Sequence, residues 1–221
     1  DLVMKNKRFK INLFIIVLLC VVTIVGLVIL PDTVPTHFNE LGVADSYSSK
    51  NSIITFPVIA ILFSIISLII AKHDPKLKEN VNYANVLGIV NIGFSCFMLM
   101  TCLGVIMYTT NPGMINISFL GCLVISLLLI LLGNIMPKIK RNLYLGIKTP
   151  WTFYSESNWE RTHRMGGRVW LIGGLINLPI CFLETPINVY STLAIFAVCA
   201  IIPAIYSYYD FKRDINFEKE N

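Results

Sequence analysis

Long uninterrupted apolar segments are the feature of this sequence that most constrains its fold. A helix needs about 20 mostly apolar residues to cross a bilayer, because every backbone N–H and C=O must be hydrogen-bonded internally. We count six such segments, and the fifth, which contains Asn177 and Pro179, is the shortest. They cover residues 11–30, 53–71, 86–108, 115–136, 169–183 and 187–209.

These segments predict an all-α, polytopic integral membrane protein with six transmembrane helices. A transmembrane barrel would need alternating strands of about ten residues, whereas the Leu, Ile and Val runs here are unbroken and about twice as long. The composition agrees, since 14% of the residues are charged against roughly 25% in soluble domains.

The basic residues predict the orientation of the chain, because cytoplasmic loops of membrane proteins are enriched in Lys and Arg. Seventeen of the 18 Lys and Arg residues lie in the segments that six crossings would place on one side, and only Lys50 lies on the other. We therefore expect both termini to be cytoplasmic in a multi-pass protein of the bacterial cytoplasmic membrane. The orientation of the chain then explains the net charge of +5, and we expect no direct nucleic-acid partner.

Two units are expected along the chain. Residues 1–85 would form a two-helix unit with an external loop that contains the sequence Pro-Thr-His-Phe. Residues 86–221 would form a four-helix unit with a basic cytoplasmic loop at residues 137–168.

The external loop at residues 31–50 contains two prolines and the turn-forming stretch 39–42, which predict turns and no regular helix. One interpretation is a hydrogen-bonded cap over the outer helix ends, and another is a binding site for an external ligand. A metal site would use Asp32, His37, Glu40 and Asp45. Their spacing matches no helix-face ligand motif, so we predict no metal.

The basic cytoplasmic loop predicts an amphipathic helix. Ser157 and Glu160 have the spacing of a capping box, so we expect the helix to begin there. At about 100° per residue, three arginines share one face, while Trp159, His163, Gly166 and Trp170 lie opposite. Gly166 and Gly167 are the expected bend. The arginines are Arg161, Arg164 and Arg168.

Three interpretations of this helix are open. Its arginines could contact anionic lipid head groups, each contributing on the order of 1 kcal/mol. The adjoining tryptophan-bearing loop, which lipid binding alone would not require, indicates docking of a cytosolic protein as the alternative. General-base catalysis by His163 would need a nucleophile or water nearby, and we predict no catalytic residue. The candidate partner-binding residues are Trp151, Trp159, Arg161, His163, Arg164 and Arg168.

The apolar segments are nearly free of ionisable side chains, which argues against ion-coupled transport and intramembrane proteolysis. No nucleotide-binding, zinc-protease or serine-hydrolase motif occurs, and no cofactor is expected. We expect Asn91, Asn134 and Asn177 to form hydrogen bonds between helices.

Two motifs resemble a known family of membrane proteins. The first is similar to a bacterial N-terminal domain of unknown function, the DUF1648 type, and reads Leu30-Pro31-x-x-x-Pro35-x-His37-Phe38-Asn39-x-x-Gly42-x-x-Asp45-x-Tyr47-x-Ser49-Lys50. The second resembles the signature of the SdpI family of toxin-immunity proteins, and reads Arg141-Asn142-x-x-x-Gly146-Ile147-Lys148-Thr149-Pro150-Trp151-Thr152, then Trp159-x-x-Thr162-His163-Arg164-x-x-Gly167.

The resemblance implies a non-enzymatic immunity or signal-transduction protein. Its implied partners are membrane lipids, an extracellular killing peptide and a cytosolic transcriptional repressor that is held at the membrane. The basic loop at residues 137–168 becomes the candidate for repressor capture. The external ligand-binding candidates are His37, Asn39, Asp45, Tyr47 and Lys50. The alternatives are a small-molecule or peptide transporter with a polar site near Asn91 and Asn177, and a membrane hydrolase that uses His163 or His37.

Overall fold

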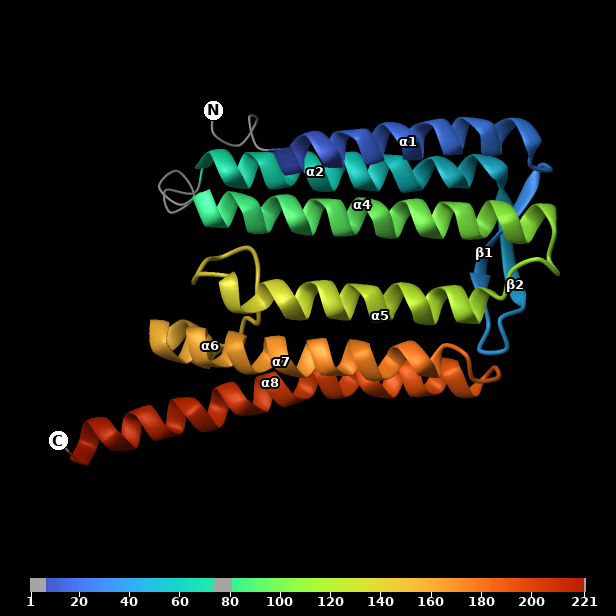
Figure 1. The fold of residues 1–221 in the computed structure, drawn as a ribbon. Helices are drawn as coiled ribbons and strands as arrows, with labels where there is room; N and C mark the ends of the chain where they lie inside the picture. The colour runs from blue at the N-terminus through green and yellow to red at the C-terminus, as the bar shows by residue number, and fades with distance from the viewer. Residues whose placement is uncertain (1–6, 74–80, 221) are drawn as a thin grey trace. The chain divides into compact units, whose positions relative to one another are not determined.

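A computed structural model describes residues 7–73 and 81–220, with side chains placed for 7–73 and 84–216 (Figure 1). The described chain is mostly helical. Its elements are α1 (Lys7–Ile29), β1 (Thr33–Phe38), β2 (Ala44–Ser49), the 3₁₀ helix η1 (Lys50–Ile54), α2 (Thr55–His73), α4 (Val81–Thr110), α5 (Ile117–Ile135), the 3₁₀ helix η2 (Met136–Lys138), α6 (Pro150–Tyr154), α7 (Glu156–Ile180) and α8 (Ile187–Glu220).

Five helical segments of the described chain are long and apolar enough to cross a membrane. They are Lys7–Ile29, Lys50–His73, Ala84–Thr110, Ile117–Lys138 and Ile187–Asn216. The fifth expected span falls in α7, which is not among them. Its first half carries three arginines, and the helix ends at Ile180, before the expected end at Leu183.

The chain divides into two compact units. One comprises Asp1–Val124 with Cys181–Tyr190, and the other Ile125–Ile180 with Ser191–Asn221. The first thus contains α1, both strands, α2 and α4, while the second contains α6, α7 and most of α8.

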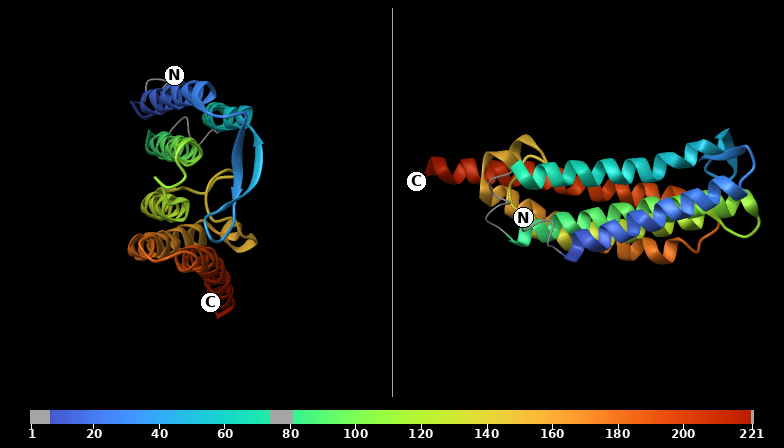
Figure 2. Two further views of the ribbon diagram at one scale, coloured as in Figure 1. Left: turned by 90° about the vertical axis from the view of Figure 1, so that its right-hand side faces the viewer. Right: turned by 90° about the horizontal axis from the view of Figure 1, so that it is seen from above.

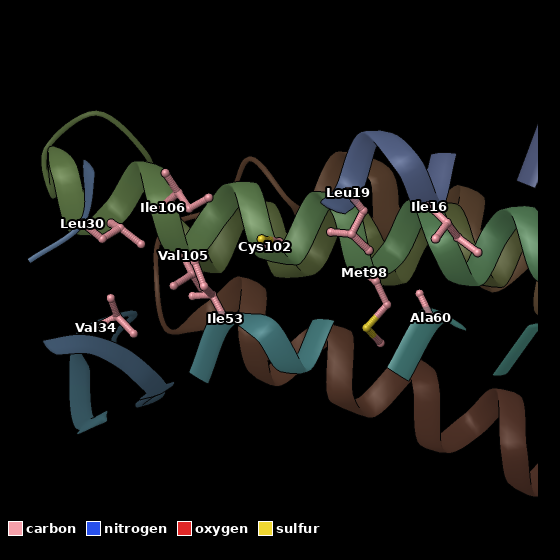
Figure 3. Packing of buried hydrophobic residues seen from close by; sticks show 10 residues of the cluster. All are labelled: Ile16, Leu19, Leu30, Val34, Ile53, Ala60, Met98, Cys102, Val105 and Ile106. Atoms are coloured by element: carbon pink, nitrogen blue, oxygen red, sulfur yellow. The ribbon is translucent and has the colours of Figure 1, made fainter. Parts of the chain in front are cut away.

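The core of the first unit lies where α1, α2 and α4 pack together (Figure 3). Leu19 and Cys102 are fully buried there. A polar link joins the same three helices, because Asn12 donates to Ser64 Oγ at 2.9 Å and accepts from Ser95 Oγ at 2.7 Å. Hydrogen bonds of this kind hold helices together where apolar surfaces alone give little specificity.

A β-hairpin occupies the segment that the sequence predicted as turns, so the all-α prediction is corrected to mostly helical. β1 and β2 pair antiparallel at one end of the helices of this unit (Figure 2). The turn expected at residues 39–42 is confirmed: Asn39 Oδ1 accepts from the N–H groups of Leu41 and Val43, both at 3.0 Å. Gly42 has φ +73°, which glycine adopts without steric cost.

In the second unit, α7 packs closely against the second half of α5 and against α8. A Cβ at Gly167 would lie 2.7 Å from the carbonyl oxygen of Gly133, so the glycine permits a close helix–helix approach. The helix continues through Gly166 and Gly167, where the sequence predicted a bend. Asn177 donates to Ser126 Oγ at 3.0 Å and accepts from Thr192 Oγ1 at 3.1 Å.

The expected role of Asn177 between helices is therefore confirmed, and the other two asparagines differ. Asn91 is buried and donates to Leu87 O, one turn earlier in the same helix, at 2.9 Å. Asn134 is exposed. Periodicity places an asparagine on a helix, but the neighbouring helix decides whether a partner is within reach.

Candidate functional site

The segment between η2 and α6 is folded around the side chain of Asn142. Its Oδ1 accepts from the backbone N–H groups of Tyr144 and Leu145, both at 2.7 Å. Its Nδ2 donates to the carbonyl oxygens of Lys140 at 2.8 Å and Leu145 at 3.0 Å. One buried amide thus satisfies four backbone groups and fixes the turn.

Two aromatic residues of α7 hold this turn onto the helix. Trp159 is fully buried and donates from Nε1 to Ile139 O at 2.8 Å. His163 stacks on the Trp159 ring, with ring centroids 4.1 Å apart and planes 18° apart. Its Nε2 accepts from the backbone N–H of Ile147 at 3.0 Å, and its Nδ1 lies 2.8 Å from Trp159 O.

These two contacts require a neutral imidazole with its proton on Nδ1. A protonated ring would place an N–H against the N–H of Ile147, so the hydrogen bond at Nε2 would be lost. Burial lowers the pKa of His163 from 6.5 to about 4, although the hydrogen bond to Trp159 O opposes this shift. The imidazole is therefore an acceptor for backbone at neutral pH.

Gly146 allows the turn to approach the histidine. It has φ +119°, and a Cβ on it would clash with His163 Nε2. Any other residue would combine a strained backbone with a steric clash. We call the set formed by Asn142, Gly146, Trp159 and His163 the loop clasp.

A capping box begins α6 and links it to α8. Thr149 Oγ1 accepts from the N–H of Thr152 at 3.1 Å, and Thr152 Oγ1 accepts from the N–H of Thr149 at 3.0 Å. Pro150 occupies the first turn, where its missing N–H costs nothing. Thr149 Oγ1 also lies 3.0 Å from Ser207 Oγ of α8.

The start of α7 differs from the capping box that the sequence predicted at Ser157 and Glu160. The helix begins at Glu156, and Ser155 Oγ accepts from the N–H of Asn158 at 3.1 Å. Glu160 instead forms an exposed ion pair with Lys140 at 2.7 Å. The hydrogen bond between them raises the pKa of Lys140 and lowers the pKa of Glu160.

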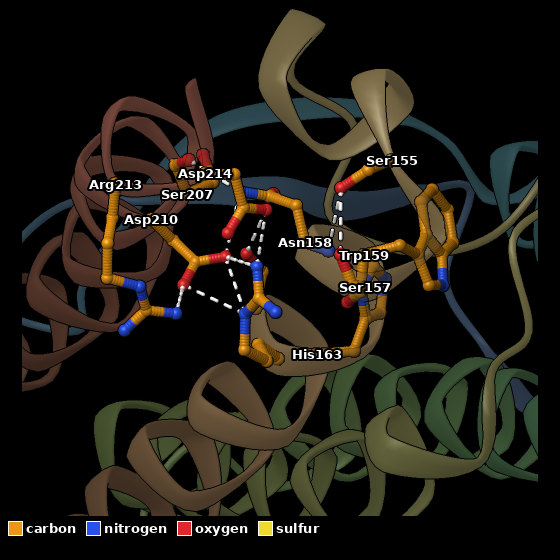
Figure 4. A network of polar contacts seen from close by, with 11 residues as sticks. Ser155, Ser157, Asn158, Trp159, His163, Ser207, Asp210, Arg213 and Asp214 are labelled. Atoms are coloured by element: carbon orange, nitrogen blue, oxygen red, sulfur yellow. Dashed lines mark hydrogen bonds and ion pairs between the residues drawn. The ribbon is translucent and has the colours of Figure 1, made fainter. Parts of the chain in front are cut away.

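An ionic cluster around the buried carboxylate of Asp210 connects α7 to α8 (Figure 4). Arg161 Nε donates to both carboxylate oxygens of Asp210 at 2.9 Å, and its guanidinium lies 2.6 Å from Asp214 Oδ2. Asn158 Nδ2 donates to Asp210 Oδ2 at 3.0 Å, and Arg213 contacts Oδ1 at 2.5 Å. The hydrogen bond to Asp210 raises the pKa of Arg161.

Asp210, Asp214 and Asn158 were missed in the sequence. The available signal is that Asp210 and Asp214 are four residues apart after a long apolar run, so they share a face of α8. Their partner Arg161 lies 49 residues from Asp210 and 53 residues from Asp214 in the chain, and only the tertiary structure brings it there.

The candidate cytoplasmic residues fall into two groups. The two faces expected for the helix are confirmed, since Trp159, His163 and Gly166 are buried while Arg164 and Arg168 are exposed. As a correction, Arg161 lies on the arginine face but is not free to bind a partner, because carboxylates of α8 bind its guanidinium.

Trp151 is half-buried and packs against Tyr208 with ring centroids 5.0 Å apart. Trp159 and His163 are too deeply buried for a partner to reach them in this arrangement. The exposed candidates are thus Arg164 and Arg168.

The candidate residues of the hairpin lie in the first unit. His37 Nδ1 lies 2.6 Å from Asp45 Oδ1, and this pair bridges the two strands. The side chain of Asn39 accepts hydrogen bonds within the turn. Tyr47 is 60% exposed, and Lys50 lies 3.4 Å from Asp32. Among the described residues, no group of three potential ligands could hold a metal ion.

The geometry of His163 is unsuited to general-base catalysis. Both ring nitrogens contact backbone groups, and the ring is only 1% exposed. A general base must reach a substrate proton or a water molecule. The loop clasp therefore positions the segment between η2 and α6 against α7.

Comparisons with known proteins match the two motifs to two separate segments. Residues 138–207 match the SdpI/YfhL protein family, and residues 14–61 match the domain of unknown function DUF1648. The immunity protein SdpI of Bacillus subtilis (strain 168) is 23% identical over 210 residues, which cover 92% of this chain and 97% of that protein. No solved structure matches.

The part of the chain that the structure describes is mostly helical, with five candidate membrane-spanning helices, a hairpin and a clasped basic loop. The resemblance inferred from the motifs is confirmed: the chain combines an SdpI/YfhL family segment with a DUF1648 N-terminal region. The family segment contains the loop clasp and Arg161, whereas its partner Asp210 lies just beyond the end of the segment.

Proposed function

We propose that this chain is a non-enzymatic immunity protein of the bacterial cytoplasmic membrane, which protects the cell from an extracellular antimicrobial peptide. The observation that carries the proposal is similarity to an immunity protein along nearly the whole length of both chains. The presence of both family segments in one chain supports it. A signalling role, with capture of a cytosolic transcriptional repressor, extends the proposal.

The proposed topology has six crossings, with both termini in the cytoplasm and the hairpin outside. Lys212 and Arg213 near the end of α8 favour a cytoplasmic C-terminus. α7 would supply the remaining crossing, although its apolar part from Val169 to Ile180 rises only about 18 Å. Arg168 could extend that crossing by directing its guanidinium to the interface.

Arg164 and Arg168 form the proposed contact surface of the basic loop. Both are exposed on a helix whose opposite face is fixed by the loop clasp. A rigid helix presents its charges at a constant spacing, which favours recognition of an acidic partner. Anionic lipid head groups would contact the same arginines when no partner is bound.

Survival of sensitive cells tests the immunity proposal. The chain is expressed in a Bacillus subtilis strain that lacks SdpI, and the cells are challenged with culture supernatant of the wild-type strain and with a panel of purified membrane-active peptides. We expect at least one challenge to leave about ten times more survivors than an empty vector does. Equal survival under every challenge, with the protein present in the membrane, would refute the proposal.

Repressor capture is tested by first examining the genes beside this one for a helix-turn-helix protein, and then fusing any such protein to a fluorescent protein. We expect the fusion to be held at the membrane by the wild-type chain and released by Arg164→Gln with Arg168→Gln. Lys7→Gln with Lys10→Gln is the matched control, since it removes two exposed charges from the same proposed face. Absence of such a neighbouring gene, or equal retention by both variants, argues against capture.

A further inference from the structure

The hairpin has one strand fixed to its unit and one strand exposed. In β1, Val34 and Pro35 are buried, and Phe38 packs edge-on against Tyr108 with ring centroids 4.9 Å apart. In β2, every residue from 45 to 49 is exposed. β2 is therefore the outer strand of the hairpin.

The pairing register identifies which backbone groups of β2 point away from β1. The N–H of Lys50 donates to Asp32 O at 2.9 Å, so this is a hydrogen-bonded pair. Hydrogen-bonded and non-hydrogen-bonded positions alternate along antiparallel strands. Tyr47 therefore directs its N–H and C=O groups to the outer edge. Ser49 offers only its N–H there, because it is the N-cap of η1 and its C=O accepts within that helix.

The opposite edge of the hairpin is closed to pairing. Pro35 is paired with Tyr47, so it also occupies a position whose backbone points outward. Proline has no N–H to offer a third strand, and this residue is buried. A third strand can thus be added beside β2 and not beside β1.

The chemistry around the β2 edge is acidic and partly apolar. The segment 31–50 carries three exposed carboxylates, of which Asp45 lies in β2 while Asp32 and Glu40 flank β1, and Lys50 is its one Lys or Arg. Leu41, Val43 and Tyr47 are also exposed, by 56%, 53% and 60%. This combination complements a cationic peptide with apolar side chains.

We propose that the β2 edge binds an extended, cationic segment of an extracellular peptide by strand addition. The N–H and C=O of Tyr47 and the N–H of Ser49 hydrogen-bond to the added strand, and the carboxylates select positive charge. The inference rests on the proposed immunity function and names the class of peptide and the surface that it contacts.

The binding test uses the full chain in nanodiscs of phosphatidylcholine, which carries no net charge to attract a cationic probe. The probe is a fluorescently labelled octapeptide of alternating Lys and Val with blocked ends. Two comparison peptides have alternating Glu and Val, or the probe sequence N-methylated at every residue. We expect both to bind at least tenfold more weakly than the probe, with empty nanodiscs as the blank.

Ser49→Pro removes one outward N–H while fitting the backbone, because Ser49 has φ −56° and proline prefers about −65°. Ser49→Ala is the matched control, since it keeps the N–H and loses only the side-chain contact with Asn51 N. We expect Ser49→Pro to weaken probe binding at least fivefold and Ser49→Ala less than twofold, with both variants melting within a few degrees of each other.

The outcomes separate this inference from the proposed function. Strand addition is wrong if the N-methylated peptide binds as tightly as the probe, if Ser49→Pro binds as tightly as Ser49→Ala, or if the probe does not bind saturably. Protection of cells by the wild-type chain would still stand in each case. If the wild-type chain protects no cells while the probe binds as expected, the immunity function fails and the edge remains a peptide-binding surface.

Discussion

The imidazole of His163 accepts a hydrogen bond from the backbone N–H of Ile147 at 3.0 Å. The same ring contacts the carbonyl oxygen of Trp159 through its other nitrogen. One neutral side chain thereby joins two segments 16 residues apart in sequence. The loop clasp keeps both of these hydrogen bonds only while the ring is neutral.

Acid should destabilise the chain through His163. The pKa is about 4 in the folded protein and 6.5 in its ordinary state, so the unfolded chain binds more protons between these values. Stability is therefore retained above about pH 6.5 and falls as the pH decreases toward 4, by about 3 kcal/mol in total. Thermal melting in detergent between pH 4 and pH 7 measures the effect.

His163→Ala provides the control for other titrating groups. The variant should be less stable than wild type at pH 7, because Ile147 N–H loses its partner at a cost of about 1–3 kcal/mol. Its melting temperature should also decrease less between pH 7 and pH 4. Parallel pH profiles for the two proteins would contradict the assignment.

Gly146→Ala should disrupt the loop clasp without changing any polar group. The added methyl group meets His163 Nε2, and alanine is strained at φ +119°. We expect a loss of about 2 kcal/mol or more, seen as a lower melting temperature. Gly121→Ala is the matched control, because nothing lies within 4 Å of its added Cβ.

The helical faces of the basic loop followed from sequence periodicity, and the contacts of those faces did not. A period of 3.6 residues separates Trp159 and His163 from Arg164 and Arg168, which is the division that the structure has. The helical period does not predict that the backbone groups of Ile139 and Ile147, on either side of the Asn142 turn, contact the aromatic face. Burial of that face depends on tertiary packing.

The hairpin is a second feature that could not be predicted from the sequence. β1 lacks the alternation of a half-buried strand, because its buried residues Val34 and Pro35 are adjacent, and β2 is mostly polar. Their pairing depends on the Asn39 turn and on the anchoring of Val34 in the helical core, which joins residues far apart in sequence. Long apolar runs, in contrast, predict helices from local composition alone.

Arg161 and Arg213 should differ in their effect on stability, although both contact Asp210. The Arg161 side chain is 27% exposed and binds two carboxylates, whereas the Arg213 side chain is 64% exposed. Arg161→Met leaves a buried carboxylate poorly compensated, and we expect a loss of about 2–3 kcal/mol. Arg213→Met should cost less than about 1 kcal/mol. Equal melting temperatures for the two variants would contradict this ranking.

Asn12 should be the polar residue of α1 that matters most for packing of the first unit. Asn12→Leu removes hydrogen bonds to Ser64 of α2 and to Ser95 of α4 together. Interhelical hydrogen bonds contribute roughly 0.6–2 kcal/mol each, so the melting temperature should decrease measurably. Asn134→Leu alters an exposed asparagine of α5 and serves as the comparison.

Reporter fusions should place both termini on the cytoplasmic side. If α7 crosses the membrane, a fluorescent protein fused after Asn221 is fluorescent, and alkaline phosphatase fused after Thr185 is active. If α7 stays on the cytoplasmic side, α8 instead carries the C-terminus outward and both signals are lost.

The charge distribution favours the first outcome, because an outward C-terminus would place the three basic residues Lys212, Arg213 and Lys219 on the wrong side. A phosphatase fusion after Leu41 in the hairpin turn should be active in either case, which makes it the internal control. Replacing Leu171 and Leu175 of α7 by Arg should abolish activity at Thr185 while leaving the fusion at Leu41 active. Two charges in so short an apolar segment add several kcal/mol to the cost of crossing.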